Sequence, residues 1–135
     1  ITASLYARRL NATRPYGYVF EGEKLVFYLH GALEGRKIDI IRNNSDCCVQ
    51  IECDVQSFSG KVACQYGCSY YSFDGFGTAK IVETPKEKIR ALRALMKTQT
   101  GKDFEFNEKL VSIVSVIRIE FDYYTAKHRP LPGTE

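Results

Sequence analysis

The residues best suited to chemistry lie in one segment, where a glycine turn leads into a short basic helix. The segment reads HGALEGRKIDIIRNN and follows the apolar run KLVFYL. Its pattern predicts a strand that ends at His30 and a helix that has Arg36 and Lys37 in its first turn and stops near Asn43. Positive charge at a helix N-terminus is unfavourable by about 0.3–1 kcal/mol per residue, because the free N–H groups there are already partly positive. The placement therefore calls for an anion that offsets it.

A phosphate group would reverse the sign of that interaction. Backbone N–H groups from Leu33 to Gly35 can point at the anion while the two cations neutralise its charge. Gly31 and Gly35 let the backbone approach the ligand closely. The glycine spacing fits neither a P-loop nor a dinucleotide-binding fingerprint. On the local residues alone, a phosphate cradle and a solvated basic helix end are equally good interpretations.

The chain has two histidines, and they differ in context. His30 ends a strand beside the glycine turn, so its side chain is expected next to any ligand held by the basic helix. A histidine within a barrel is more often structural, but this position favours a site. His128 belongs to a basic, proline-containing tail, AKHRPLP, where simple solvation explains it.

A second candidate region is an aromatic strand, YYSFDGFG. Tyr70, Tyr71 and Phe73 lie beside Gly75 and Gly77, which indicate a β-bulge or a close backbone approach. A planar ligand could stack on these rings. Aromatic residues also favour cross-strand packing in sheets, and on pattern alone packing is the better interpretation.

Five cysteines are present, at positions 47, 48, 53, 64 and 68. An odd number with this spacing is untypical of a secreted disulfide scaffold, so we expect reduced thiols in a cytoplasmic protein. No CxxC pair occurs, and we expect no metal site. A nucleophilic cysteine paired with His30 or His128 is a lesser alternative, because the strand pattern directs the first three thiols inward.

The remaining sequence predicts mostly long strands. A hairpin is expected over Tyr16–Leu29, and further strands over Asp46–Phe58, Cys68–Glu83 and Ser112–Tyr124. Residues 4–10 are ambiguous between strand and helix, and residues 125–135 read as a tail. Long antiparallel strands with few helices predict one mainly β domain over residues 1–135, built as a small, nearly closed barrel with two flanking helices.

The clearest helix is TPKEKIRALRALMKT. Thr84 is a natural N-cap, Pro85 takes the first helical position, and Glu87 would complete a capping box. Ile89, Leu92, Leu95 and Met96 form an apolar stripe that we assign to core packing.

Composition excludes little. The 135 residues are 44% hydrophobic and 26% charged, with a formal net charge of +3. No apolar run approaches the roughly 20 residues of a membrane span, and no signal peptide is visible. A nucleic-acid-binding small barrel is a weak alternative, because the charge is modest and the basic residues form no stripe.

Taken together, the segments resemble a known family. YGYVFEGEKLVFYLHGALEGRKIDIIRNN, CCVQIECD, YYSFDGFGTAKIVE, LMKTQTGKDFEF and YYTAKHRP follow one another in unbroken order from Tyr16 to Pro130. In this order they resemble the pyridoxamine 5′-phosphate oxidase-like flavin-binding split barrels, and within them the Nim-type proteins named for 5-nitroimidazole resistance. The resemblance implies a six-stranded antiparallel split β-barrel that forms a homodimer, with FMN at the subunit interface.

The resemblance also assigns residues to the cofactor. It implies that Gly35, Arg36 and Lys37 hold the FMN phosphate, with the backbone at Leu33 nearby. His30, Gly31 and Ala32 would line the flavin, and His30 inherits the functional role of the histidine that Nim-type members carry near the ring. Further flavin contacts are implied for the aromatic strand and for the basic tail, at Tyr70, Ser72, Asp74, Lys127 and Arg129.

The implied function is that of an FMN-dependent oxidoreductase, with FAD as the other possible flavin. A small-molecule electron acceptor, such as a nitro-aromatic compound reduced to an amine, would be the substrate, and NAD(P)H is a candidate donor. We expect a cytoplasmic homodimer that binds neither membranes nor nucleic acid. A non-catalytic flavin or haem carrier on the same fold is the alternative, since a fold does not determine a function.

The first hairpin departs from the family pattern. Relatives have a longer strand of the kind PYVVPLN, which supplies backbone contacts to the flavin ring, whereas here NATRPYGYVF passes almost directly from Pro15 to Gly17. We therefore treat residues 1–15 as an atypical or incomplete first strand and expect that a segment is missing from the chain as given. An intact mass equal to 15.4 kDa would contradict this expectation.

Overall fold

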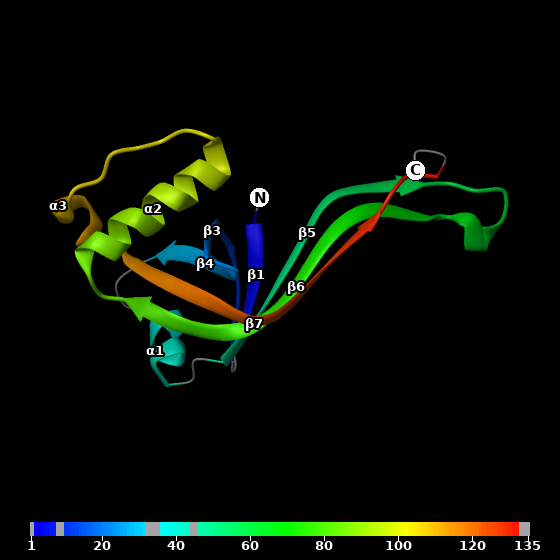
Figure 1. The fold of residues 1–135 in the computed structure, drawn as a ribbon. Coiled ribbons are helices and arrows are strands. Elements are labelled where there is room, and N and C mark those ends of the chain that lie inside the picture. The colour runs from blue at the N-terminus through cyan, green and yellow to red at the C-terminus, as the bar shows by residue number, and fades with distance from the viewer. Residues whose placement is uncertain (1, 8–9, 32–35, 44–45, 133–135) are drawn as a thin grey trace.

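The computed structural model describes residues 2–7, 10–31, 36–43 and 46–132 (Figure 1). Seven strands make up most of the chain: β1 (Thr2–Ala7), β2 (Leu10–Pro15), β3 (Gly17–Glu21), β4 (Lys24–Gly31), β5 (Asp46–Phe58), β6 (Gly67–Val82) and β7 (Ser115–Arg129). The helices are α1 (Arg36–Asn43), α2 (Pro85–Thr100), the single turn α3 (Glu108–Val111) and the 3₁₀ turn η1 (Ala63–Gln65). No helix in these described ranges is long and apolar enough to cross a membrane.

All seven strands form one antiparallel sheet in the order β2-β1-β5-β6-β7-β4-β3. The two edge strands, β2 and β3, are consecutive in the chain and are joined by Tyr16 alone. Because one residue spans only about 3.5 Å, the sheet must curl until its two edges meet at that point. The mainly β split-barrel fold expected from the sequence is thereby confirmed. It has seven strands where six were expected, because the ambiguous first residues form the hairpin β1–β2.

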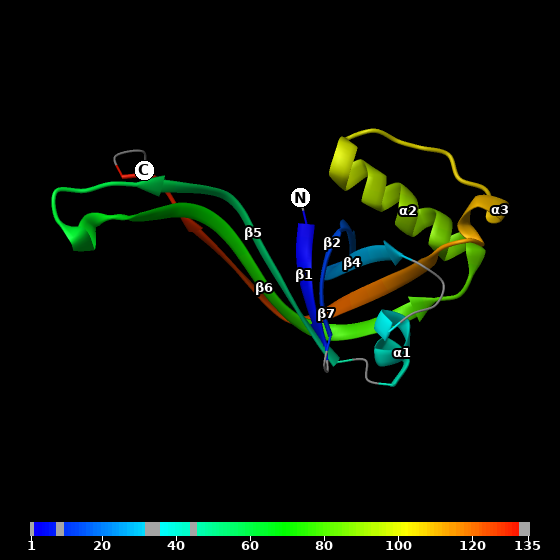
Figure 2. The same cartoon turned by 180° about the vertical axis from the view of Figure 1, so that it is seen from behind.

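Strand β4 lies between two apolar layers. Leu25, Phe27 and Leu29 alternate into the barrel interior, while Val26 and Tyr28 point to the outer face and pack with Leu92 of α2 and its neighbours. The predicted β3–β4 hairpin is confirmed, with Gly22 at φ 66° in its turn. Helix α1 contributes Ile38 and Ile41 to the barrel interior, so it closes one end of the barrel, as Figures 1 and 2 show. Helix α2 covers the outer face.

Beyond the barrel, the N-terminal half of β6 and the adjoining parts of β5 and β7 extend as a long arm (Figure 2). We define the arm as residues 50–74 together with residues 124–132. A register shift between Phe76 and Gly77 marks the bend where the arm leaves the barrel. A Cβ at Gly77 would overlap the Glu120 carbonyl, and one at Gly75 would lie 2.5 Å from the Phe121 ring, so the predicted bulge and close approach are both confirmed. Strand β7 continues to Arg129, past Tyr124 where the sequence pattern ended it, because residues 126–129 pair with β6.

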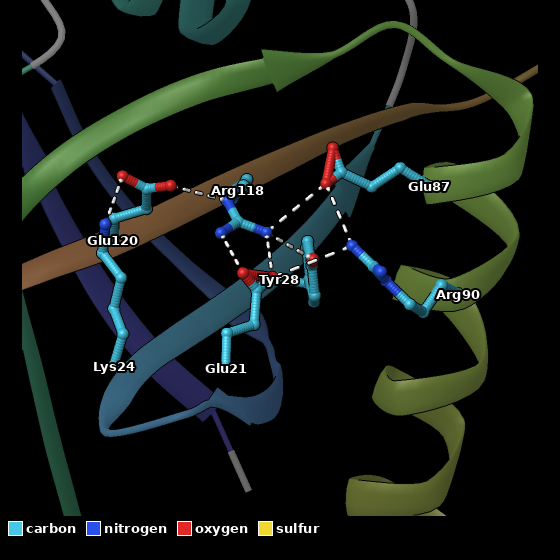
Figure 3. A network of polar contacts seen from close by, with 7 residues as sticks. All are labelled: Glu21, Lys24, Tyr28, Glu87, Arg90, Arg118 and Glu120. Atoms are coloured by element: carbon cyan, nitrogen blue, oxygen red, sulfur yellow. Dashed lines mark hydrogen bonds and ion pairs between the residues drawn. The ribbon is translucent and has the colours of Figure 1, made fainter.

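A partly buried arginine joins α2 to the sheet (Figure 3). Arg118 of β7 makes two contacts of 2.6 Å with the Glu21 carboxylate and contacts Glu120 at 3.0 Å and Glu87 at 3.4 Å. The same guanidinium donates a hydrogen bond to the Tyr28 hydroxyl at 2.9 Å. Its side chain is only 12% exposed, so these contacts have replaced most of its water.

The capping box predicted for α2 is absent. Thr84 is at the N-cap position and Pro85 opens the helix, as predicted, but the Thr84 side chain makes no capping hydrogen bond. The Glu87 carboxylate lies near Arg118 and Arg90 instead. A buried cation attracts a carboxylate more strongly than a solvent-exposed N–H group does, which explains the difference.

Candidate functional site

The basic helix begins where the sequence predicted it. Helix α1 starts at Arg36, so Arg36 and Lys37 are its first two residues and it ends at Asn43. His30 and Gly31 close strand β4, and His30 pairs in register with Val116 of β7 and is exposed to solvent. Ala32, which was predicted to line the flavin, and Leu33 and Gly35, which were predicted to approach the phosphate, lie outside the described residues.

The other predicted cofactor residues gather on the arm. Tyr70 pairs across the β6–β7 ladder with Arg129, and Ser72 pairs with Lys127. Side chains alternate between the two faces of a strand, so Tyr70, Ser72 and their two partners share one face. Asp74 lies on the same face, two residues further along. The structure thus places all five predicted residues on one face of the arm, although the Arg129 guanidinium lies over the Phe58 ring and does not line the groove beside the other four.

That face of the arm carries a groove of about 350 Å³. Its polar lining includes Gln50, Glu52 and Lys127, and Gln50 Nε2 donates a hydrogen bond to Asp74 Oδ1 at 2.9 Å. Two carboxylates line the groove, so it suits a ligand edge that donates and accepts hydrogen bonds better than it suits a phosphate. We call this surface the outer groove.

The two groups of predicted residues lie far apart within one chain. His30 pairs with Val116 and Ser72 pairs with Lys127, and both partners belong to strand β7. At about 3.3 Å per residue, the strand between them measures roughly 36 Å. The strand bends, yet Figures 1 and 2 agree in placing α1 and the arm at opposite ends of the sheet. Measured along β7, the separation of the two groups exceeds the length of a flavin mononucleotide.

A second hollow, of about 400 Å³, lies on the opposite face, where the curled sheet opens toward the arm. Sequence reasoning missed it, because its residues come from five strands and from the β2–β3 junction. The lining is mostly aromatic and comprises Tyr16, Tyr18, Phe20, Leu25, Phe27, Ile51, Tyr71, Ser72, Phe73, Ala126, Lys127 and His128. We call it the aromatic hollow.

His128 belongs to this hollow and not to a solvated tail. Its ring stacks on Tyr71, with centroids 4.0 Å apart and planes at 3°. Deeper in, Phe27 stacks on Tyr16 at 4.8 Å and on Phe73 at 5.3 Å. The packing interpretation of the aromatic strand is therefore right for Phe73, whereas Tyr71 keeps 47% of its surface exposed.

The thiols that can be described are free. Burial raises the pKa of Cys47 to about 12, and burial also raises the pKa of Cys48, so neither is an activated nucleophile. Cys64 and Cys68 are exposed near the tip of the arm, far in sequence from both histidines, and the Cys53 side chain lies outside the described part. Within the described ranges, no group of three or more His, Cys, Asp or Glu side chains could hold a metal ion.

Comparison with solved structures identifies similar folds. A candidate 5-nitroimidazole antibiotic resistance protein from Bacteroides thetaiotaomicron matches with a TM-score of 0.77 at 22% identity, covering 93% of this chain and 75% of that one. The flavocytochrome Anf3 from Azotobacter vinelandii matches with a TM-score of 0.75 at 15% identity, covering 97% of this chain and 63% of that one. At these identities the likeness shows the fold.

A third similar structure is the FAD and haem binding protein from Mycobacterium smegmatis. It matches with a TM-score of 0.69 at 17% identity and covers 96% of this chain. This chain spans 65% of that protein and, as given above, 63% of the flavocytochrome, so it corresponds to less than two thirds of either.

Comparison with curated protein sequences found no match. A family model described as pyridoxamine 5′-phosphate oxidase, however, matches residues 7–128, which is nearly the whole chain. The curled antiparallel sheet, with one helix closing its end and another covering its outer face, is the fold expected of that family. The chain therefore belongs to the pyridoxamine 5′-phosphate oxidase family.

Proposed function

We propose that two copies of this chain bind a flavin, FMN in the first instance, at their interface and act as a flavin-dependent oxidoreductase. The observation that carries the proposal is the separation of the predicted cofactor residues. The α1 end of the barrel and the outer groove are too far apart to share one flavin within a chain. In a symmetric dimer, the α1 end of one copy can meet the arm of the other, and each pair of copies then has two equivalent sites.

The chemistry of the two surfaces suggests how the flavin is divided between them. A helix start that contains Arg36 and Lys37 suits a phosphate, because N–H groups and cations both favour the anion. The outer groove has Glu52, Asp74, Gln50 and Lys127, a mixed set of donors and acceptors that suits the polar edge of the flavin ring. The carboxylates would repel the phosphate, so the reverse orientation is disfavoured.

His30 is the proposed reactive side chain. It ends β4 only a few residues before α1, so a phosphate held at α1 leaves the rest of the flavin within reach of His30. An imidazole titrates near neutral pH and can donate a proton to a reduced acceptor or orient that acceptor. The bound flavin supplies the hydride or electron chemistry, and the chain's own residues supply position and electrostatics. Nitro-aromatic compounds are the proposed acceptors.

The absorption spectrum of the purified protein, followed by mass identification of the released chromophore, tests the cofactor. A flavin spectrum with FMN as the released compound is expected. Colourless protein that takes up no added FMN or FAD would contradict the proposal. For the phosphate site, Arg36→Ala with Lys37→Ala should lower flavin affinity by about tenfold or more while the unfolding free energy changes little.

A matched control removes the same charge elsewhere. Lys97→Ala with Lys102→Ala takes two exposed cations from the region where α2 ends. This variant should keep the flavin affinity of the parent protein. If both double variants lose flavin equally, the loss reflects net charge and the α1 site is wrong.

A non-catalytic flavin or haem carrier is the second candidate, because the similar structures include a flavocytochrome and an FAD and haem binding protein. Reduction of the flavin by NAD(P)H, followed by reoxidation with a nitro-aromatic acceptor, separates the two. Turnover supports the oxidoreductase. A flavin that binds but is not reoxidised by any acceptor supports the carrier.

A further inference from the structure

The aromatic hollow adjoins the outer groove that we assign to the flavin, but most of its lining residues are different. Tyr71 and Phe73 project from β6 on the face opposite to Tyr70, Ser72 and Asp74, because successive side chains of a strand alternate. Phe73 packs into the barrel interior, which confirms the side on which this face lies. The two surfaces adjoin, because four residues line both of them: Ile51, Ser72, Phe73 and Lys127. The other residues of the aromatic hollow line it alone.

The hollow has the size and composition of a small-molecule site. Its volume of about 400 Å³ falls within the range of roughly 300–1,000 Å³ that is typical of ligand pockets. Six of its lining residues carry phenyl or phenol rings, namely Tyr16, Tyr18, Phe20, Phe27, Tyr71 and Phe73. Such rings stack on planar molecules in offset or edge-to-face geometry.

Much of this aromatic surface is open to solvent. Tyr18 is 48% exposed, Phe20 is 59% exposed and Tyr71 is 47% exposed, although all three line one concave surface. Contiguous exposed apolar surface of this kind marks a binding site more often than isolated exposed residues do. Behind it, the buried ring of Phe27 and the partly buried ring of Phe73 form a floor that is held by ring contacts to Phe121.

The rim of the hollow carries basic side chains. Lys127 and His128 are the basic residues of the lining, and no carboxylate of a described residue belongs to it. The imidazole of His128 is held flat against Tyr71, which fixes its position at the edge. A ligand with a flat apolar body and an acidic group at one end would bury the body against the rings and leave the acid beside the two basic side chains.

From these observations we infer that the aromatic hollow is a second ligand site, beside the proposed flavin site, for a planar aromatic carboxylate. The hollow lies at the seam where β2 and β3 fail to pair and only Tyr16 joins them. The inference does not depend on the flavin, because every residue that carries it lies in one chain.

Calorimetric titration of the purified protein with 2-naphthoate tests the inference. Adamantane-1-carboxylate is the matched ligand, since it has the same charge and an apolar body that is not flat. Naphthoate should bind, and the adamantane compound should bind at least about tenfold more weakly. Equal affinity for the two, or no naphthoate binding at millimolar concentration, would overturn the proposal.

Neighbouring tyrosines on opposite faces of β6 supply the matched variants. Tyr71→Ser should weaken naphthoate binding by about tenfold, whereas Tyr70→Ser should leave it within about twofold. Ala126→Trp, which fills the hollow from an exposed position, should also abolish binding and serves as the second variant if Tyr71→Ser does not fold. Loss of affinity in Tyr70→Ser equal to that in Tyr71→Ser would place the ligand elsewhere.

Competition with FMN separates this site from the proposed flavin site. Saturating FMN should weaken naphthoate binding by no more than about tenfold, because the two ligands would share only the rim residues between the two surfaces. Stoichiometric displacement of naphthoate by FMN would show that the hollow is the flavin site itself and would overturn the inference. Naphthoate binding in protein that takes up no flavin would instead contradict only the proposed function.

Discussion

The side of the barrel that α2 covers and the arm contain the same kinds of residue, but these residues differ in their exposure to solvent. Under α2, aromatic and aliphatic side chains are buried, and the charged groups at its edge contact a guanidinium that is 12% exposed. On the arm, Tyr66 is 60% exposed and Tyr71 is 47% exposed. The arm's polar side chains line grooves open to solvent.

The difference in solvent exposure indicates which residues stabilise the fold and which are available for binding. A residue that has already exchanged water for protein contacts contributes to the folded state, and its loss leaves a cavity or an unpaired charge. A residue that still faces water contributes little to folding and is available to a ligand or to a second subunit. We therefore expect substitutions under α2 to change unfolding free energy and substitutions on the arm to change binding.

The largest stability loss is expected for Leu92→Ala. Leu92 is 8% exposed and packs with Val26 and Tyr28 between α2 and the sheet. Its truncation should lower the unfolding free energy by about 2–4 kcal/mol, measured by urea denaturation. Tyr66→Ala on the arm is the control and should cost less than about 0.5 kcal/mol. Comparable losses in the two variants would abolish the distinction between the regions.

Arg118→Met should have the next largest effect, about 2–3 kcal/mol, because it leaves the carboxylates of Glu21, Glu87 and Glu120 without their shared cation. Arg93→Met removes an arginine whose ion pair with Asp103 is exposed on both sides, and it should cost no more than about 0.5 kcal/mol. Urea denaturation measures both variants. An Arg118→Met protein as stable as the Arg93→Met protein would show that the buried network does not stabilise α2.

The same network predicts an acid-sensitive part of the stability. The hydrogen bond from Arg118 lowers the pKa of Glu21 below the ordinary value of a glutamate, and the hydrogen bonds from Lys24 and then Arg118 lower the pKa of Glu120. A carboxyl group whose pKa is depressed in the folded state stabilises that state above the unfolded pKa, and this contribution is lost as pH falls through the folded pKa.

The unfolding free energy should therefore fall between about pH 5 and pH 3, and the fall should be smaller in Arg118→Met. Urea denaturation at a series of pH values measures it. Identical pH profiles for the two proteins would contradict the role assigned to Arg118.

The smallest expected stability change belongs to Asp74→Asn on the arm. The substitution weakens one hydrogen bond with Gln50 in a solvent-open groove, so it should alter the unfolding free energy by less than about 0.5 kcal/mol. Flavin affinity should fall clearly in the same variant if the outer groove holds the ring edge. Unchanged flavin affinity would remove Asp74 from the site.

Local patterns predicted the elements well. The alternation of Leu25, Phe27 and Leu29, the glycines of the bulge and the start of α1 at Arg36 all follow from backbone propensity and side-chain period. The prediction of a capping box was wrong because the Glu87 carboxylate contacts Arg118. Arg118 belongs to strand β7, and no local sequence pattern connects it to Glu87. The aromatic hollow was missed for the same reason, since five strands and the β2–β3 junction contribute to it.

Strand pairing could be predicted for part of the candidate site, whose assignment to a cofactor stays a prediction. Tyr70, Ser72, Asp74, Lys127 and Arg129 do meet on one face, because strand pairing places them there. Their separation from His30 could not be predicted from the sequence, since it depends on how far β7 runs and on the bend at Gly77. Sequence reasoning ended β7 at Tyr124, and that error concealed both the arm and the stacking of His128 on Tyr71.

Mixed dimers test the central claim most directly. One copy carries Arg36→Ala with Lys37→Ala, the other carries Tyr70→Ser with Lys127→Ala, and two affinity tags select the complexes that contain both. If each flavin is bound by the α1 end of one copy and the arm of the other, one of the two sites in every mixed dimer is intact. Flavin content should then reach about half that of the parent protein, although each variant alone binds almost none. Mixed dimers as empty as the two variants alone, or a protein that forms no dimer, would contradict the account.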